Sequence, residues 1–547
     1  MCGIVAAVSD RKEVSAEALR AAVASMRHRG PDESSVWRAD DASGGLGHAR
    51  LSIIDLTTGR QPIANEDGTL HIAVNGEFYD FERIRGELEA RGHRFRTRSD
   101  SEIALHLYEE RGVECFDELR GEFAFAVWDG RRRRMFAARD RFGIKPLFYA
   151  RHGATWWIAS EVKALAAAGV PLRWDREAVY DSLFSNLSPE RTLFAGVKQV
   201  PPGCYLEATE GGDVRIAAYW KTNYPKAGEE PVGTEAEWIE RLRAEAAEAV
   251  RLRLRADVPV GCLLSGGLDS SAALGMARKF FGGEMKAFTI AFDHPDFDES
   301  AVAAASAAAA GVEFIPIRVT NADFARVFED AVAQGESIQY NAHGAARYLL
   351  SRGVRDAGVK VVLAGEGADE ISAGYRFFDR SLGIGGAVPP SRWPAEVVRA
   401  LSLDTQPDAG VVAALVARAQ ALAFPAASAA AVAGRRALEN GVVSAEFTRE
   451  QTGRNPLWEF YRRMDVAEQM DGRVPVRQVM HLWMKSGFAN YVLGGERLDM
   501  AHAVEQRLPF LDHKLFEVAR ALPVELLRRD GQEKWVLREA MRPFVTE

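Results

Sequence analysis

One stretch, residues 258–271 (VPVGCLLSGGLDSS), constrains the fold of this chain more than any other. Its apolar part, residues 260–264, predicts a short buried strand, and the run SGGLDSS follows without a spacer. Residues 272–279 behind this run are good helix formers. A strand, a glycine-rich turn and a helix start direct unpaired backbone N–H groups at an anion, so we expect this segment to bind phosphate.

The loop differs from the common nucleotide-binding loops, because it lacks the Lys of GxxxxGK[ST] and does not read GxGxxG. Its glycines allow a close backbone approach and its serines offer hydroxyl donors. These residues are Ser265, Gly266, Gly267, Ser270 and Ser271. Asp269 can hold Mg²⁺ against phosphate oxygens. The loop therefore suits a pyrophosphate, and the alternative is an ordinary strand-to-helix turn rich in small residues.

The bulk properties favour a multidomain enzyme of small metabolites. A length of 547 residues predicts two to four domains. The net charge of −8 and the pI near 5.9 argue against nucleic acid as a partner. The run Arg131 to Arg134 lies between two strand-like segments and is typical of a solvated hairpin turn.

The four cysteines, at positions 2, 115, 204 and 262, form no CxxC pair and no spacing suited to zinc or to a disulfide framework. A reducing cytoplasm is the expected compartment. No apolar run approaches the roughly 18 residues of a membrane span, so we expect no membrane partner.

Cys2 opens the chain in the strand-like run CGIVA. If Met1 is removed, residue 2 carries both a thiol and a free α-amine. That amine can accept the thiol proton, so nucleophile and base lie on one residue. The alternative is a buried strand cysteine.

Further blocks in the first 165 residues follow the order found in class II glutamine amidotransferases, which the chain resembles. The blocks are HRGPDESS (28–35), GHARLSIIDL (47–56), VNGEFYDF (74–81), RSDSE (98–102), GEFAFAVWD (121–129), ARDRFGIKPLFY (138–149) and SEVKAL (160–165). The resemblance implies that Cys2 attacks the side-chain amide of glutamine.

The same resemblance assigns the glutamine pocket. Arg50 would bind the α-carboxylate and Asp100 the α-ammonium, while Asn75 and the Gly76 N–H would form the oxyanion hole. The remaining pocket residues would be Leu51, Ser52, Ile53, Ile54 and Glu77. From the residues alone, Asn75 and Gly76 are also typical of a hairpin turn, and Asp100 of a helix cap.

The second half resembles the PP-loop ATP pyrophosphatases and, over nearly the whole chain, the glutamine-hydrolysing asparagine synthetase family. The matching blocks are SGGLDSS (265–271), AGEGADEISAGY (364–375), YVLGGERLDMAHAVEQRLPFLD (491–512) and GQEKWVLREAM (531–541). The implied ATP-binding residues are Leu264, Ser265, Gly266, Gly267, Asp269, Ser270, Ser271, Ile290, Ala364 and Gly365. Asp269 and Asp369 would share Mg²⁺, Glu366 would act as a base near the adenylated carboxylate, and Lys534 would neutralise charge on the α-phosphate.

We expect a two-domain fold. Residues 1–208 would form an α+β Ntn-hydrolase-type sandwich of antiparallel sheets, 209–235 a linker, and 236–547 a doubly wound α/β domain with a parallel sheet. Strand-like runs at 286–292, 313–319 and 360–363 alternate with helical segments at the spacing typical of such a sheet. Residues 380–450 are expected to be helices that cover the sheet.

The resemblance predicts ATP- and glutamine-dependent conversion of aspartate to asparagine through an acyl-AMP, with release of AMP and pyrophosphate. Because members of the family are commonly dimeric, it also implies a homodimer. Three departures lie near the expected carboxylate pocket: DEISAGY in place of DExFGGY, ERLDMA in place of DRxSMA, and no His at 314–317. A different carboxylate from a biosynthetic pathway is therefore the main alternative. An intramolecular amide former and a non-enzymatic module are further alternatives, and the intact Cys2, Glu366 and Lys534 argue against them.

Overall fold

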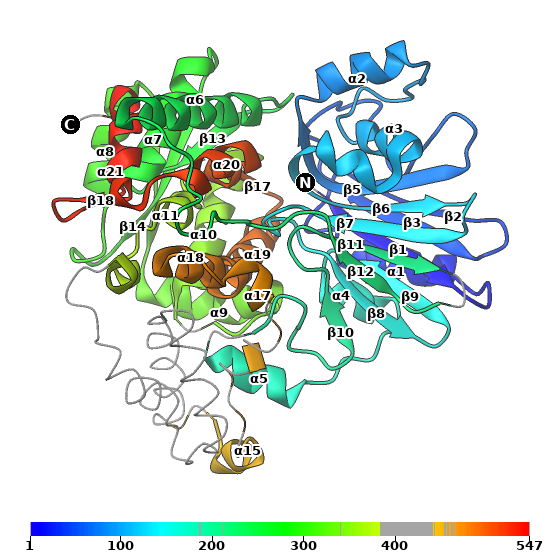
Figure 1. Ribbon diagram of the computed structural model, residues 1–547. Helices are drawn as coiled ribbons and strands as arrows, with labels where there is room; N and C mark the ends of the chain where they lie inside the picture. The colour runs from blue at the N-terminus through cyan, green and yellow to red at the C-terminus, as the bar shows by residue number, and fades with distance from the viewer. Residues whose placement is uncertain are drawn as a thin grey trace.

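The computed structural model has two lobes, with the first half of the chain at the right of Figure 1 and the second half at the left. It describes residues 2–545, except 185–186, 210–211, 340, 383–440 and eight positions between 442 and 464. Most of the helices expected over 380–450 fall outside the described residues. Within the described part of the chain, every helix is too short or too polar to cross a membrane.

The first lobe is a sandwich of two six-stranded antiparallel sheets. One has the order β10(Val197–Gln199), β8(Phe148–His152), β9(Thr155–Ala159), β1(Gly3–Ser9), β3(Gly44–Arg50), β2(Glu33–Arg38). The other has the order β12(Arg215–Ala218), β11(Cys204–Thr209), β7(Arg134–Arg139), β6(Arg120–Asp129), β5(Leu70–Tyr79), β4(Ile63–Ala64). These sheets confirm the expected fold class of this half.

Strand β1 explains how the sandwich is filled, because all seven of its residues are buried. Ile4, Ala6 and Val8 belong to the core between the two sheets. Val5 and Ala7 point to the opposite side and pack in the core under the outer helices. The helices of this lobe are α1(Ala16–Ser25), α2(Phe81–Ala90), α3(Glu102–Arg111), α4(Val162–Ala167) and α5(Arg176–Leu183).

Strand β12 lies within the range 209–235 that composition predicts to be a linker. It pairs with β11, with Cys204 opposite Ala218 and Glu207 opposite Arg215, so the second sheet extends to Ala218. The strand was missed because it is an edge strand of four residues that are only partly buried or exposed. The predicted turn at Arg131 to Arg134 connects β6 and β7, and each of its arginines contacts a carboxylate.

The second lobe is built on a five-stranded, all-parallel sheet. Its order is β15(Glu313–Val319), β14(Lys286–Phe292), β13(Val260–Leu263), β16(Val361–Leu363), β17(Glu505–Arg507). In chain order this reads 3-2-1-4-5, the order of a doubly wound fold, and it confirms the expected α/β class. The topological switch point falls between β13 and β16, where such folds bind their ligands.

Among the described residues, the helices of this lobe are α6(Glu235–Arg253), α7(Leu268–Phe280), α8(Ser300–Ala310), α9(Asn321–Gly335), α10(His343–Asp356), α11(Ala368–Ser372), α15(Ala445–Glu450), α17(Val466–Gln469), α18(Pro475–Lys485), α19(Gly487–Met500), α20(His513–Ala521) and α21(Trp535–Met541). A two-stranded hairpin, β18(Arg528–Arg529) and β19(Gln532–Glu533), precedes α21. Helix α6 begins with a capping box between Thr234 and Glu237, which stabilises its first turn where the chain enters this lobe.

Candidate active site

Cys2 lies directly before β1 and is 7% exposed. Its backbone nitrogen donates to Asn75 Oδ1 at 2.9 Å, and its Sγ lies 3.9 Å from the Leu51 carbonyl oxygen. The Asn75 Nδ2 is buried and has no hydrogen-bond partner among the described residues. Asn75 thus anchors residue 2 with its oxygen, and its N–H₂ group is available to a ligand.

Gly76 lies in the middle of β5, opposite Phe123 of β6, so the hairpin-turn interpretation of Asn75 and Gly76 is wrong. The φ of Gly76 is +148°, and a Cβ at this position would lie 2.1 Å from the Glu122 carbonyl oxygen. Only glycine fits, because the neighbouring strand leaves no room for a side chain. The glycine that suggested a turn is required here because β6 lies so close to β5.

The residues predicted to bind the α-amino acid end lie around Cys2. Arg50 ends β3, with Nη2 on the Asp55 carbonyl oxygen and Nη1 3.7 Å from Glu33. Asp100 accepts from the Phe78 N–H at 2.8 Å, so its side chain binds β5 and does not cap α3. Burial raises the pKa of Asp100 to about 6. The chain 51–54 is also mostly buried here, with Ser52 N on Asp32 at 2.8 Å.

Glu77 adds a second carboxylate to this chamber. Burial, and then the charge of Asp100, raise its pKa well above the ordinary value. Its Oε1 lies 3.4 Å from Arg507 Nη2 of the other lobe, while its Oε2 is buried with no hydrogen bond to any described residue. Two close buried carboxylates favour a cation between them, as the α-ammonium of an amino acid would supply.

The serine-glycine loop joins β13 to α7 at the switch point. Ser265 and Ser270 are linked through their hydroxyls at 3.0 Å, and Ser270 Oγ also accepts from the Ser265 N–H. Ser271 Oγ contacts Ser306 of α8 at 3.3 Å. Gly266 has φ +80°, and a Cβ there would lie 2.8 Å from the Ala303 nitrogen. The loop is therefore held against α8 with the first turn of α7 behind it, as phosphate binding requires.

Lys534 forms ion pairs with both aspartates that are predicted to bind the metal. Its Nζ lies 2.6 Å from Asp269 Oδ2 and 2.6 Å from Asp369 Oδ1. Burial raises the pKa of Asp269 to about 6, although the positive charge of Lys534 acts to lower this pKa. The other oxygen of Asp269, Oδ1, is buried without a hydrogen-bond partner in the described chain. An unsatisfied carboxylate oxygen beside a second carboxylate fits a Mg²⁺ ion, so the two residues suit the metal that the sequence predicts.

The other predicted nucleotide residues lie around the same loop. Gly365 follows β16, and a Cβ there would lie 2.7 Å from the Ser270 nitrogen, so the end of β16 is in close contact with the first turn of α7. The Leu264 N–H donates to the Phe288 carbonyl at 2.8 Å. Residues two apart on a strand direct their backbone groups to the same side. Ile290 therefore directs its backbone N–H and C=O groups toward the space beyond the end of β13, as expected for a contact to adenine.

Glu366 lies next to a buried cluster that sequence reasoning did not identify. Arg347 Nη1 binds Glu366 Oε1 at 2.9 Å, and Arg347 Nη2 binds Asp499 Oδ2 at 2.6 Å. Arg347 also contacts Gln506 Oε1. The second oxygen of Glu366, Oε2, is buried with no partner among the residues described. Asp499 could have been singled out from the sequence, because it is one of the residues at which ERLDMA departs from DRxSMA. Its partner Arg347 could not, because it lies 152 residues away in sequence.

Strand β17 connects the two chambers because its residues alternate between them. Arg507 reaches Glu77 beside Cys2, whereas Gln506 reaches Arg347 beside Glu366. Glu505 binds Arg507 at 2.6 Å, and Lys145 Nζ of the first lobe binds the Gln506 carbonyl at 3.3 Å. A second link joins Arg29, whose Nε donates to the Cys2 carbonyl, to Glu496 of α19.

A separate group of potential metal ligands lies away from both chambers. Ligand atoms of Glu66, His93, His106 and Glu109 lie within 4.8 Å of one another. His93 binds Glu66 and Glu110 at 3.0 and 3.1 Å, and Glu109 accepts from Asn65 and Arg131. Because most of these atoms already have protein partners, we interpret the group as an ion-pair network.

A sandwich with Cys2 directly before its inner strand β1, joined to a doubly wound sheet with a serine-glycine loop, defines a two-domain glutamine amidotransferase. Residues 1–220 match the family described as glutamine amidotransferase domain, and residues 241–547 match asparagine synthase. The chain belongs to the glutamine-hydrolysing asparagine synthetase family and is a glutamine-hydrolysing amidotransferase ligase.

Three curated relatives illustrate the range of this family. Amidase chry2 of Gibberella zeae is 34% identical, covering 100% of this chain and 87% of that protein. Amidase chyE of Penicillium rubens is 35% identical, with coverages of 95% and 81%. Asparagine synthetase [glutamine-hydrolyzing] 1 of Bacillus subtilis is 31% identical, with coverages of 95% and 80%.

Proposed function

We propose that this enzyme uses glutamine and ATP to amidate a carboxylate through an acyl-AMP. The carboxylate oxygen attacks the α-phosphorus of ATP, and the bond to pyrophosphate breaks. The nitrogen released from glutamine then attacks the acyl carbon, and AMP leaves. This sequence is needed because a carboxylate is a poor electrophile until an adenylyl group turns its oxygen into a leaving group.

In the first chamber, Cys2 would attack the glutamine amide. Burial raises the pKa of the Cys2 thiol, so the thiol needs a base. With Met1 removed, the α-amine of residue 2 is that base, and Asn75 Oδ1 holds its nitrogen. The free Nδ2 of Asn75 and the Gly76 N–H would stabilise the oxyanion, while Arg50 and Asp100 hold the two charged groups of the amino acid.

In the second chamber, the serine-glycine loop would bind the phosphates and Ile290 the adenine. Asp269 and Asp369 would hold Mg²⁺, which when bound neutralises charge on the phosphate oxygens. Lys534 would stabilise charge on the α-phosphate, and the unpartnered Glu366 Oε2 would take a proton from the attacking nitrogen. Separation of the chambers keeps ammonia neutral and away from water, so we expect it to pass between them along β17.

The observation that carries this proposal is the alternation of β17. Arg507 and Gln506 are adjacent residues, yet one contacts the thiol chamber and the other contacts the Glu366 cluster. A chain that only hydrolysed glutamine or only adenylated an acid would not need this shared wall.

The acceptor has two candidates. Family resemblance predicts aspartate, with asparagine as the product. A different carboxylate is favoured by the two relatives named as amidases and by Asp499, which binds Arg347 at a position where the family often has Ser. A cytoplasmic location and a homodimer stay predictions.

Paired variants test the two chambers separately. Cys2→Ala should abolish glutamine-dependent AMP formation and leave ammonium-dependent AMP formation intact. Asp269→Asn should reduce AMP formation by at least about tenfold and leave glutamine hydrolysis intact. If either change abolished both reactions in folded protein, the assignment of separate chambers would be wrong.

A further inference from the structure

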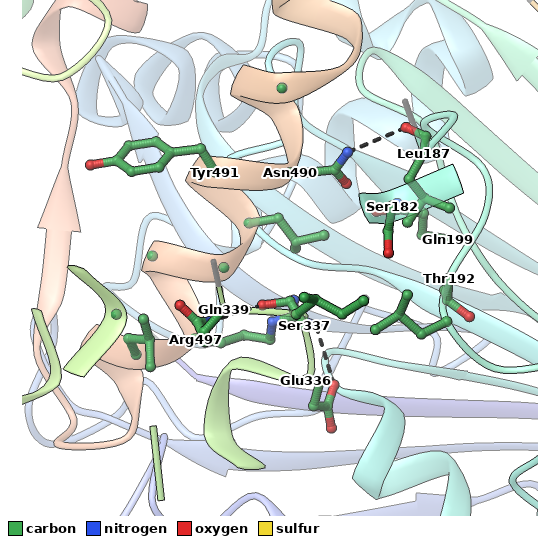
Figure 2. Close-up of a pocket in the computed structure, with 18 of the residues that line it drawn as sticks. Ser182, Leu187, Thr192, Gln199, Glu336, Ser337, Gln339, Asn490, Tyr491 and Arg497 are labelled. Carbon is green, nitrogen blue, oxygen red and sulfur yellow. Dashed lines mark hydrogen bonds and ion pairs between the residues drawn. The ribbon is translucent and has the colours of Figure 1, made fainter. Parts of the chain in front are cut away.

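A cavity of about 450 Å³ lies between the lobes, beside the Glu366 cluster. Figure 2 shows it between α19, which carries Asn490, and the facing residues Ser182, Leu187 and Thr192 of the first lobe. Its size falls in the range of about 300–1,000 Å³ typical of pockets for drug-sized ligands. An acid with the four-carbon skeleton of aspartate would fill only a small part of it.

The walls of the cavity are largely apolar. Both lobes contribute hydrophobic side chains, among them Phe148, Leu187, Leu193, Ile338, Leu493 and Leu498. Removing such surface from water favours binding by about 25 cal/mol per Å² of apolar area. A ligand with an apolar body gains from this contact, whereas a small zwitterion loses its hydration there.

The cations that line the cavity are already matched by protein carboxylates. Arg191 binds Asp175 at 2.7 Å, and Arg497 lies 3.3 Å from Glu336. Arg347 binds Asp499 at 2.6 Å. Burial lowers the pKa of His343, so this ring is neutral near pH 7. Aspartate carries two carboxylates and an ammonium, and these side chains offer no unmatched charge for the groups that do not react.

Arg347 connects the cavity to Glu366. Arg347 lines it and binds Glu366, and Gly365 next to Glu366 packs on the serine-glycine loop. Tyr491 projects from α19 on the side away from Asn490, is 40% exposed, and has its ring 6.0 Å from the Arg347 guanidinium carbon. The part of the cavity at Arg347 therefore lies one residue from Glu366, and the lining as a whole is more apolar than polar.

We propose that the acceptor is a carboxylic acid with an apolar body larger than the side chain of aspartate, and that this body occupies the cavity with its carboxylate at Glu366. The inference rests on the proposed function. The acid's oxygen displaces pyrophosphate from ATP, the ammonia nitrogen displaces AMP from the acyl carbon, and Glu366 takes the nitrogen's proton.

A panel of acids tests this inference. AMP formation is measured with ammonium as nitrogen donor, so that the result does not depend on Cys2, using benzoate, 2-aminobenzoate, phenylacetate, hexanoate and aspartate. We expect the kcat/KM of at least one apolar acid to exceed that of aspartate about tenfold. Hydrophobic pockets discriminate between substrates that differ in apolar groups by about 10- to 200-fold. A higher value for aspartate would overturn the inference and leave the proposed function standing. No AMP from any acid, with glutamine still hydrolysed, would overturn both.

A matched pair of glycine variants tests the place of binding. Gly494 lies in α19 on the cavity wall, and a Cβ there would meet only Ser337 Oγ, at 3.6 Å. Gly494→Leu should fill the cavity and lower kcat/KM for the preferred apolar acid at least about tenfold, with glutamine hydrolysis unchanged. The control, Gly86→Leu in α2, also enters open space but lies outside the cavity and should change neither reaction.

Retention of full activity by folded Gly494→Leu would overturn the assignment of the cavity to the acceptor. Glutamine hydrolysis and the thermal midpoint report on folding. If Gly494→Leu does not fold, Gly494→Ala replaces it, because its Cβ is in ordinary van der Waals contact. That smaller change should still raise KM for the bulkiest acid of the panel above that of Gly86→Ala, and equal values would count against the assignment.

Discussion

Buried carboxylates set the properties of the glutamine chamber at the scale of single residues. Asp100 is 3% exposed, and burial raises its pKa from 3.8 to about 6. In the unfolded chain Asp100 would ionise near its ordinary pKa of 3.8. At pH values above this pKa, the folded state therefore bears the free-energy cost of ionising a buried carboxyl group. This cost is absent below about pH 4, grows between pH 4 and 6, and is constant at higher pH. In the proposed function, this buried charge binds the α-ammonium of glutamine.

Asp100→Asn should therefore stabilise the protein while it damages glutamine binding. We expect a gain of at most on the order of 3 kcal/mol in the free energy of unfolding at pH 7, and no gain below about pH 4. The glutamine KM should rise at least about thirtyfold, since a buried charge loses its partner. Chemical denaturation at pH 4 and 7, with glutaminase kinetics, checks both effects.

The wild-type enzyme supplies the control for this prediction. Its glutamine KM should rise as the pH falls through about 6, where Asp100 becomes protonated, and the KM of Asp100→Asn should lack this dependence. A wild-type KM that stays flat from pH 5 to 8 would contradict the role of Asp100.

The sequence predicted the chemistry of single residues better than their contacts. Cys2 binds Asn75 of β5 and Asp100 binds Phe78 of the same strand, while their roles toward glutamine stay predictions. Arg347 was not predicted, since a lone arginine in a helix carries no signal until the fold brings it to Glu366 and Asp499. The hairpin at Gly76 was wrong because glycine marks turns and close strand contacts alike.

At the scale of elements, the serine-glycine loop depends on its contact with α8. Gly266 and Gly311 both have positive φ, at +80° and +65°. A Cβ on Gly266 would collide with the backbone of α8, whereas a Cβ on Gly311, at the end of α8, would meet nothing within 4 Å. Alanine at either position bears a similar backbone strain of about 1 kcal/mol, so the pair isolates the effect of the collision.

Gly266→Ala should raise the KM for ATP at least about tenfold, because the loop must move away from α8 to admit the methyl group. Gly311→Ala should lower the thermal midpoint slightly and leave the KM for ATP unchanged. Pyrophosphate release at varied ATP concentration gives both values, with glutamine hydrolysis as the folding check. Equal ATP kinetics in the two variants would show that the packing of the loop does not govern nucleotide binding.

Strands could be predicted from the sequence where their side chains are mostly apolar. β14 and β15 lie at the predicted residues 286–292 and 313–319, because both strands contain apolar runs, although β15 is an edge strand in which only Val319 is fully buried. β17 gave no such signal, because it reads Glu-Gln-Arg. Its buried side chains contact Glu77, Arg347 and one another through ion pairs and hydrogen bonds. The element that joins the chambers was therefore the one that sequence pattern could not identify.

At the scale of the whole molecule, the two lobes act as one enzyme only if nitrogen passes between them. The lobes are tied by buried ion pairs, such as Arg253 with Glu122 at 2.8 Å and Arg29 with Glu496. Such contacts hold the thiol chamber in a fixed position relative to the adenylation chamber. In the proposed function, ammonia passes from one lobe to the other along β17, which contacts Glu77 through Arg507 and Arg347 through Gln506.

Isotope transfer tests this account most directly. The enzyme is given glutamine labelled with ¹⁵N in its side-chain amide, ATP, the best acid of the panel and an excess of unlabelled ammonium, and the amide product is analysed by mass spectrometry. The account predicts that the ¹⁵N fraction of the product far exceeds that of the free ammonium pool, and that Cys2→Ala yields only unlabelled product. Product whose label equals that of the free pool would contradict it.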